Sequence, residues 1–189
     1  MKKLFYIAIS LSVIFFFSTT TLAEEEGEPT TYFTIFGEIE PNIMSKVLLA
    51  SISMTTPSLT LLINSFGSDT DSAMSFYSSV KKTKPNIITV GLGSISSAAV
   101  LLFCSAEKRI ISRRAYIILH PIKTNFEGIT LDVAKKMNDF LTKNYSKAIS
   151  ETTNGKLTPK KIVEMMKENT LLTGEQAVSL GIATELLEK

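Results

Sequence analysis

A run of small residues at positions 93–103, GSISSAAVLLF, contains three serines: Ser94, Ser96 and Ser97. A serine can act as a nucleophile if the fold supplies a base, a group that orients this base, and donors for the oxyanion. Glycine and alanine also permit close backbone approach, so the same run could be only a tightly packed helix start. The remainder of the chain has to distinguish these two interpretations.

The base has one candidate, because His120 is the only histidine of the chain. It follows the apolar run 116–119 and precedes Pro121. Functional groups of α/β proteins gather at the carboxyl ends of strands, and Ser97 lies beyond the end of another apolar run, 87–92. Taken alone, His120 could be a polar strand end bonded to backbone. The pair of Ser97 and His120 is more informative than either residue.

Two glycine-containing turns could supply the oxyanion donors. Gly67 and Ser68 follow the apolar run 59–63, and Gly93 precedes the serines. Turns at strand ends and helix N-termini expose backbone N–H groups. An anion that forms beside Ser97 would therefore meet the N–H groups of Ser68 and Ala98.

The pattern of apolar residues predicts alternating strands and helices for the first two thirds of the chain. Strands are expected near 32–36, 59–63, 87–92, 109–111 and 116–119, with a turn at 64–68. Helices are expected at 41–54, 69–82 and from the serines to about 105. This alternation indicates βαβ units, an α/β class and a mostly parallel sheet.

The last third has a helical pattern instead. One helix of about 20 residues, near 130–152, carries the apolar residues Val133, Met137, Phe140, Leu141 and Tyr145. Shorter helices are expected after the capping residue Thr158 with Pro159, and at 173–176, which has the capping-box pattern. The long helix has no place in a doubly wound sheet, so we expect it to pack on another subunit and the protein to be an oligomer.

The N-terminus has the form of a secretory signal peptide. Lys2 and Lys3 precede an apolar run, 4–17, and small residues lead to Ala23 before an acidic run. We expect cleavage after Ala23, so that 1–23 is removed and 24–189 forms one domain of an exported protein, periplasmic or secreted. The alternative is an uncleaved anchor, for which the apolar run is shorter than the roughly 20 residues of a spanning helix.

Charge and cysteine content exclude some functions. The chain has 20 Lys+Arg and 18 Asp+Glu; removal of 1–23 takes away two lysines and leaves 18 of each. A neutral mature chain gives no support for a nucleic-acid surface. Cys104 is the only cysteine, so no internal disulfide is possible, and its apolar neighbours predict a small buried side chain.

Four stretches, in this order and spacing, resemble the proteolytic subunits of the Clp protease family. They are INSFGSDTDSAMSFYSSV, GLGSISSAAVLLF, AYIILHP and LLTGEQAVSLGIATEL. The resemblance extends from about 36 to 187. It implies a crotonase-like α/β spiral with a projecting handle helix at about 130–152, a serine peptidase activity, and a homo-oligomeric ring around an inner chamber.

The resemblance also implies the site residues. The nucleophile is Ser97, four residues after Gly93; the base is His120; and the third member of the catalytic triad falls on Asn169. The backbone N–H groups of Ser68 and Ala98 are the oxyanion donors. No metal or cofactor is expected. Ser94 and Ser96 are expected to cap the helix that follows.

Several residues depart from the family pattern. Asn169 replaces the usual aspartate; an amide oxygen can orient His120 but cannot stabilise the imidazolium. Asp69, Glu127 and Glu168 are candidate substitutes for the missing charge. Ser68 replaces a glycine, which strains the turn if a positive φ is needed there. Glu168 replaces a frequent arginine of ring contacts, which favours a single heptamer-like ring over a stacked pair.

The expected substrates are peptides or unfolded proteins, cleaved without ATP. The segment before the first strand is short, and an exported protein would meet no ATP-driven unfoldase, so no ATPase partner is expected. Two alternatives stay open. One is an inactive or weakly active ring that binds exported proteins, favoured by Asn169 and Ser68. The other is an acyl-CoA enzyme of the crotonase fold, disfavoured because no glutamate pair lies near the oxyanion turns.

Overall fold

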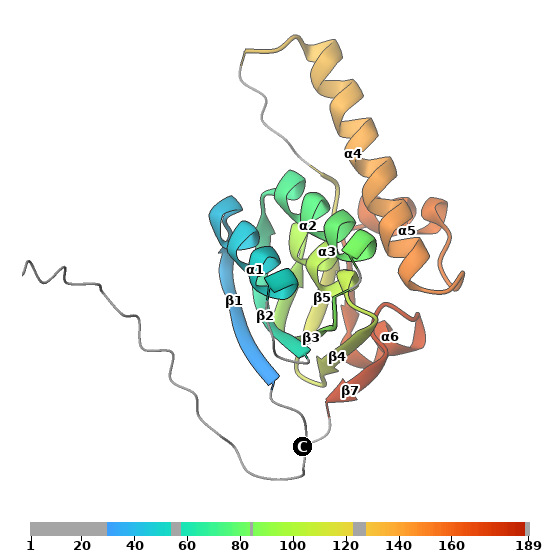
Figure 1. Ribbon diagram of the computed structural model, residues 1–189. Coiled ribbons are helices and arrows are strands. Elements are labelled where there is room, and N and C mark those ends of the chain that lie inside the picture. Colours follow the sequence, from blue (N-terminus) through green and yellow to red (C-terminus); the bar gives the residue numbers. More distant parts are fainter. Residues whose placement is uncertain (1–29, 54–57, 84, 123–127, 188–189) are drawn as a thin grey trace, which may run out of the picture.

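Figure 1 shows the computed structural model of the chain, which describes residues 30–53, 58–83, 85–122 and 128–187. Strands and helices alternate through the first half, and helices dominate the C-terminal third. The elements are β1 (Thr30–Ile39), α1 (Pro41–Ser53), β2 (Ser58–Ser68), α2 (Thr70–Thr83), β3 (Ile87–Ser96), α3 (Ala98–Ser105), β4 (Lys108–Ser112), β5 (Tyr116–Leu119), α4 (Leu131–Thr152), α5 (Pro159–Lys167), β6 (Thr170–Thr173), α6 (Gly174–Ser179) and β7 (Glu185–Leu187).

The strands form one mixed sheet with the order β1-β2-β3-β4-β7. The long strand β3 has two different neighbours on one side. Its first half, residues 88–91, pairs with β4, and its second half, residues 94–96, pairs with β5. Strand β5 pairs in turn with β6, and this is the antiparallel pair of the sheet. The sheet therefore divides where β3 passes Gly91 and Gly93, just before the serines.

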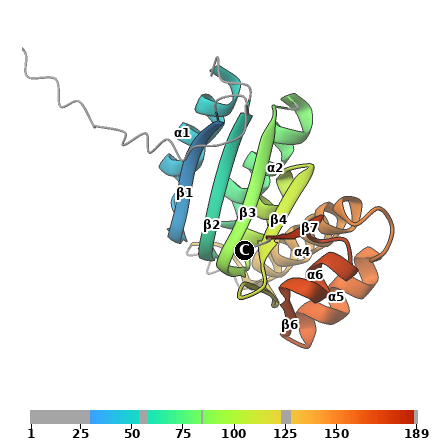
Figure 2. The ribbon, with the colours of Figure 1, turned by 90° about the horizontal axis from the view of Figure 1, so that it is seen from below.

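The first three helices cover one face of this sheet (Figures 1 and 2). Helix α3 is buried along its whole length, and Phe103 and Leu101 are inaccessible to solvent. It packs against α2, β2, β3 and α4. Full burial explains why residues 98–105 carry apolar and small side chains all round and no charge, as a helix inside a core requires. The turn that joins β3 to α3 is therefore attached to a rigid core.

A buried arginine connects the C-terminal third to this core. Arg109 of β4 is 6% exposed and donates to backbone carbonyls at the ends of several elements. These are the carbonyls of Ile182 (2.7 Å), Ala106 (2.9 Å), Glu107 (2.8 Å), Thr152 (3.3 Å) and Gly181 (3.2 Å). Burial lowers the pKa of Arg109 from its ordinary value. Because the guanidinium has donors in a fixed fork, one side chain can satisfy carbonyls from separate segments.

The prediction of a turn at 64–68 is wrong, because β2 continues through these residues to Ser68. Strand β2 remains paired with β1, and the register of this pair shifts between Gly37 and Glu38 of β1. Ser65 maintains the pairing, since its hydroxyl donates to the carbonyl of Gly37 over 2.6 Å. The short strands β6 and β7 were not predicted. Two of the predicted helix caps are confirmed: Thr158 and Thr173 accept from the backbone of Lys161 and Gln176, the latter in a complete capping box.

The long helix α4 projects beyond the other elements, as Figure 1 shows. Its second half packs on α3 and α5 and buries Leu141 and Tyr145. The predicted apolar stripe is therefore divided, because three of its members remain exposed: Val133 (42%), Met137 (37%) and Phe140 (67%). Ile129 and Leu131, next to the start of the helix, are exposed as well, at 40% and 88%.

The predicted signal peptide, 1–23, lies outside the described residues. In the ranges that the structure describes, none of the helices combines the length and the apolar character needed to cross a bilayer.

Candidate active site

Ser97 stands between the end of β3 and the start of α3, in an uncommon backbone conformation. Its φ is 55° and its ψ is −127°. A non-glycine residue at positive φ in this region costs about 1–3 kcal/mol and persists only where the surrounding structure imposes it. Ser97 occupies the N-cap position of α3, but its side chain makes no capping hydrogen bond to the described residues of this helix. The strained turn therefore does not serve to cap the helix.

Ser94 and Ser96 lie inside β3, so the prediction that they cap the helix is wrong. The backbone N–H of Ser94 donates to Oδ1 of Asn64 over 2.9 Å, and the buried hydroxyl of Ser94 has no hydrogen-bond partner among the described residues. A Cβ at Gly93 would lie 2.5 Å from the same Asn64 oxygen. A side chain at 93 would therefore displace the Asn64 amide from its hydrogen bond to Ser94. Asn64 was missed by the sequence analysis because its partner comes from another strand.

The end of β2 packs directly on the Ser97 turn. A Cβ at Gly67 would lie 2.8 Å from the Ser96 carbonyl oxygen, 2.8 Å from Cβ of Ser97 and 2.9 Å from the backbone nitrogen of Ala98. Gly67 also has a φ of +96°. Only glycine permits this contact. Ser68 is the next residue, so the structure brings the end of β2, which carries the Ser68 N–H, beside the turn that carries the Ala98 N–H.

The positive φ expected at Ser68 is present, with a value of 129°. Serine occupies a conformation there that glycine adopts at no steric cost. The N–H group itself is unaffected by this exchange. The departure from glycine therefore changes the stability of the turn and leaves a donor in place.

His120 follows β5, which runs beside the end of β3. The pairing of Ser96 with Ile118 brings the two strand ends together, and the Ser97 N–H donates to the Ile118 carbonyl over 3.4 Å. Nδ1 of His120 lies 2.9 Å from the carbonyl oxygen of Pro121. A carbonyl can only accept, so this contact requires a proton on Nδ1 and leaves Nε2 as the free acceptor. Nε2 is the nitrogen that a general base would use.

His120 and Asn169 adjoin the same end of the antiparallel pair of β5 and β6. The last pair of this ladder is Leu119 with Thr170, and His120 follows Leu119 while Asn169 precedes Thr170. Asn169 is exposed and has a φ of 52°, directly after Glu168, the C-cap residue of α5. Asparagine is among the few residues that adopt this conformation readily, which is a structural reason for its presence.

The candidate substitutes for the missing charge are placed as follows. Asp69 follows Ser68, and its carboxylate accepts from the backbone N–H of Ser72 over 2.6 Å, which caps α2. Glu168 is exposed and precedes Asn169. Glu127 lies outside the described residues. Among the described residues, no three His, Cys, Asp or Glu side chains form a group that could hold a metal ion.

Two buried groups, one in α3 and one in α4, have raised pKa values and stay uncharged at neutral pH. Burial raises the pKa of the Cys104 thiol to about 11, so it remains protonated at neutral pH. Cys104 is inaccessible, as the sequence predicted. Burial also raises the pKa of Tyr145 well above its ordinary value, and its hydroxyl donates to the Ser97 carbonyl over 2.9 Å. The sequence analysis treated Tyr145 only as part of an apolar stripe.

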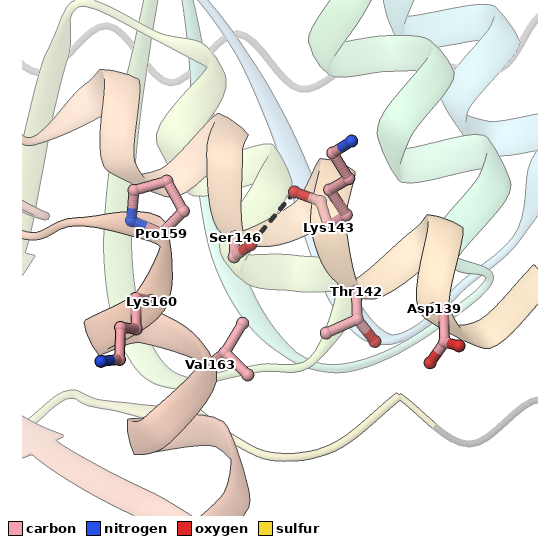
Figure 3. Close-up of a pocket in the computed structure, with 7 residues that line it drawn as sticks. All are labelled: Asp139, Thr142, Lys143, Ser146, Pro159, Lys160 and Val163. Carbon is pink, nitrogen blue, oxygen red and sulfur yellow. Dashed lines mark hydrogen bonds between the residues drawn. The ribbon is translucent and has the colours of Figure 1, made fainter.

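A hollow of about 320 Å³ lies elsewhere, between α4 and α5 (Figure 3). Lys143 and Lys160 are among the residues that line it, together with Pro159 and Val163. Ser146, which also lines it, donates to the Lys143 carbonyl over 3.0 Å. None of the residues predicted for the active site lines this hollow, so it is separate from the Ser97 turn.

The Ser97 hydroxyl, the His120 imidazole and the Ser68 and Ala98 N–H groups are the kinds of group that acyl transfer needs: a nucleophile, a base and oxyanion donors. Known proteins of one family resemble this chain. Residues 32–189 match the family described as Clp protease. Subunit 2 of the ATP-dependent Clp protease of Borreliella burgdorferi is 28% identical over 82% of this chain and 81% of its own. Proteolytic subunit 3 of Rhizobium meliloti is 25% identical over 81% of each chain.

The fold agrees as well. A solved structure of an asparagine-to-aspartate mutant of ClpP1 from Listeria monocytogenes superimposes with a TM-score of 0.73, at 23% identity. The match covers 84% of this chain and 91% of that one. The predicted α/β architecture, a spiral of βαβ units with a projecting helix, is thereby confirmed.

Proposed function

Because this chain belongs to the Clp protease family and is a peptidase homologue of Clp proteolytic subunits, we propose that it is an exported, ATP-independent serine peptidase. Its substrates are peptides or unfolded proteins. Ser97 is the nucleophile and His120 the general base, with Asn169 orienting His120. The backbone N–H groups of Ser68 and Ala98 stabilise the oxyanion.

The conformation of Ser97 carries this proposal. A helix cap ordinarily has extended φ and ψ and uses its side chain to accept from the helix, and Thr130, Thr158 and Thr173 do so here. Ser97 has neither property. A sharp turn between a strand and a helix, with a strained serine at its apex, is how a nucleophilic hydroxyl is exposed next to free helix N–H groups. A serine used only for packing would gain nothing from this strain.

The geometry supports a two-step acyl transfer. The Ser97 hydroxyl attacks the carbonyl carbon of the scissile peptide, while Nε2 of His120 takes the hydroxyl proton. The oxyanion that forms accepts from the Ala98 and Ser68 N–H groups. Collapse of the tetrahedral adduct breaks the C–N bond, and His120 returns the proton to the leaving amine. Water, deprotonated by His120, then releases the acyl group and restores Ser97.

A serine-directed fluorophosphonate probe tests the proposal. The mature chain should form a covalent adduct on Ser97, and Ser97→Ala should abolish both labelling and peptide hydrolysis. Ser96→Ala is the matched control, because it removes a hydroxyl from the adjacent residue of β3 and should retain labelling. An adduct on another residue, or labelling that persists in Ser97→Ala, would remove Ser97 as the nucleophile. A wild-type chain inert to the probe would favour the inactive ring.

Assembly into a homo-oligomeric ring is part of the proposal. Its support is the exposed apolar side of the projecting helix, where Leu131 and Phe140 are 88% and 67% exposed. An exposed apolar surface of this kind marks an interface. A single heptamer-like ring is expected, because Glu168 departs from the family pattern. Sedimentation of the mature chain at micromolar concentration tests this, and a monomer would contradict it.

Export has a separate test. N-terminal sequencing of the protein isolated from the cell envelope or medium should begin at Glu24. A cytosolic chain that begins at Met1 would refute export and would reopen the question of an ATPase partner.

A further inference from the structure

The hydrogen bond between Tyr145 and Ser97 joins two distant segments. Tyr145 belongs to α4, 48 residues after Ser97, and its hydroxyl donates to the Ser97 carbonyl oxygen over 2.9 Å. The side chain is only 2% exposed. A buried hydroxyl that lies this close to the turn of the nucleophile has an energetic effect on the turn, because its loss would leave a buried acceptor less well satisfied.

Within the part of the chain that the structure describes, the Ser97 carbonyl accepts from two donors. One is the N–H of Val100, at 3.0 Å, within the first turn of α3. The other is the Tyr145 hydroxyl, which comes from outside this turn. The first bond would form in any helix that begins at this position, but the second exists only because α4 packs on α3. Tyr145 therefore supplies a constraint on the Ser97 peptide that α3 cannot supply by itself.

The constraint acts on the oxyanion donor. The Ser97 carbonyl and the Ala98 N–H belong to the same peptide group, which is planar and trans, so they point in opposite directions. Fixing the carbonyl toward Tyr145 fixes the direction of the Ala98 N–H. An oxyanion donor stabilises the transition state most when it is oriented before the reaction.

The donor role of Tyr145 is permanent over the working pH range. Burial raises the pKa of this phenol well above its ordinary value of 10. The hydroxyl therefore stays protonated at neutral and mildly alkaline pH, and it cannot become an acceptor that would repel the carbonyl.

We propose that Tyr145 is a positioning residue that anchors the Ser97 peptide and thereby aims the Ala98 N–H at the oxyanion. This inference rests on the proposed peptidase function. It predicts that loss of one hydroxyl on α4 slows acylation of Ser97, although Tyr145 does not contact the substrate.

Tyr77 offers a matched control. Its buried hydroxyl also donates to a backbone carbonyl, that of Ala148, over 3.0 Å, and burial raises its pKa as well. Tyr145→Phe and Tyr77→Phe thus each remove one buried hydroxyl that bonds a main-chain oxygen. We expect similar losses of thermal stability from both. The two variants differ in which carbonyl is released, since only Tyr145→Phe frees that of Ser97.

The experiment compares kcat, KM and the rate of fluorophosphonate labelling, well below the unfolding midpoint of the less stable variant. Tyr145→Phe should lower kcat and the labelling rate about tenfold, the factor that 1.4 kcal/mol of barrier represents, with KM within about twofold. Tyr77→Phe should change each by less than about twofold. Equal effects in the two variants would show that Tyr145 is merely structural and would overturn the proposal.

Amide hydrogen exchange separates this inference from the proposed function. Exchange of the Val100 N–H should be faster in Tyr145→Phe than in Tyr77→Phe, because Val100 shares its acceptor with Tyr145. If the wild type is inert to the probe, the peptidase function fails and exchange alone decides. Faster exchange then supports the anchoring of the Ser97 peptide, whereas equal exchange in the two variants refutes it.

Discussion

Asn169→Asp should increase the turnover of this peptidase. Residues 120 and 169 adjoin the last pair of β5 and β6, Leu119 with Thr170, and the exchange replaces an amide by a carboxylate of the same shape. An amide oxygen can accept from the imidazole but adds no charge. A carboxylate also stabilises the imidazolium that forms when His120 takes the Ser97 proton. The variant therefore lowers the barrier to acylation.

The expected magnitude follows from the exposure of residue 169 and from the separation that a hydrogen-bonded carboxylate and imidazolium would have. Two unit charges about 4 Å apart interact by about 1 kcal/mol in water and about 4 kcal/mol at the effective dielectric of a protein surface. Residue 169 is exposed, so the lower part of this range applies. A gain of about 1–2 kcal/mol corresponds to an increase in kcat of about 5–30-fold. This is well below the roughly 10⁴-fold effect of the same aspartate–asparagine exchange in the buried triad of trypsin.

The Pro121 carbonyl competes for the same nitrogen of His120. It lies 2.9 Å from Nδ1, so the new carboxylate has to replace it or share the proton. Hydrogen bonds to an ionised acceptor are about twice as strong as those between neutral groups. The introduced carboxylate should therefore orient the ring in place of the backbone contact, without loss of the tautomer that leaves Nε2 free.

Asn154→Asp is the matched control. Asn154 and Asn169 share a φ of 52° and lie on either side of α5 in the chain. The control introduces the same charge in the same backbone conformation, but away from His120. Hydrolysis of an unstructured peptide and labelling by the fluorophosphonate are measured for both. An unchanged rate in Asn169→Asp, or an equal rise in Asn154→Asp, would refute the role of residue 169 in orienting His120.

Three further variants test the turn and the core. Gly67→Ala should lower kcat more than about 100-fold, since the added Cβ would lie 2.8 Å from Ser97 Cβ. Gly155→Ala is the control and should keep its activity, because Gly155 also has a positive φ but no other described atom lies within 4 Å of the added Cβ. Ser68→Gly should raise the free energy of unfolding by about 1 kcal/mol, measured by urea titration, because glycine adopts a φ of 129° without strain. The kcat should be nearly unchanged, and a lower stability would contradict this prediction. Arg109→Lys should lower the free energy of unfolding by about 3 kcal/mol, because one ammonium cannot replace the guanidinium bonds to five carbonyls. Its control is Arg114→Lys at an exposed position, which should have little effect.

Local sequence was sufficient for the elements whose stabilising contacts are near in the chain. The caps Thr158 and Thr173 bond to residues three positions later, and apolar periodicity identified the helices and the buried strands. Local sequence was not sufficient where contacts between distant segments determine the backbone conformation. Residues 64–68 have the composition of a turn, but pairing with β1 and the Ser65 bond to Gly37 keep them in β2.

The candidate site also has some features that the sequence predicts and others that only tertiary contacts determine. The sequence proposed Ser97 and His120 from their residue types and their positions after apolar runs, and it proposed Asn169 only through the resemblance to the Clp family. Tertiary structure alone decided the positive φ of Ser97 and the close packing of Gly67 on this turn. It also decided the bond from Tyr145 to the Ser97 carbonyl. A sequence specifies which groups are available, whereas the direction of a peptide N–H depends on contacts with residues far along the chain.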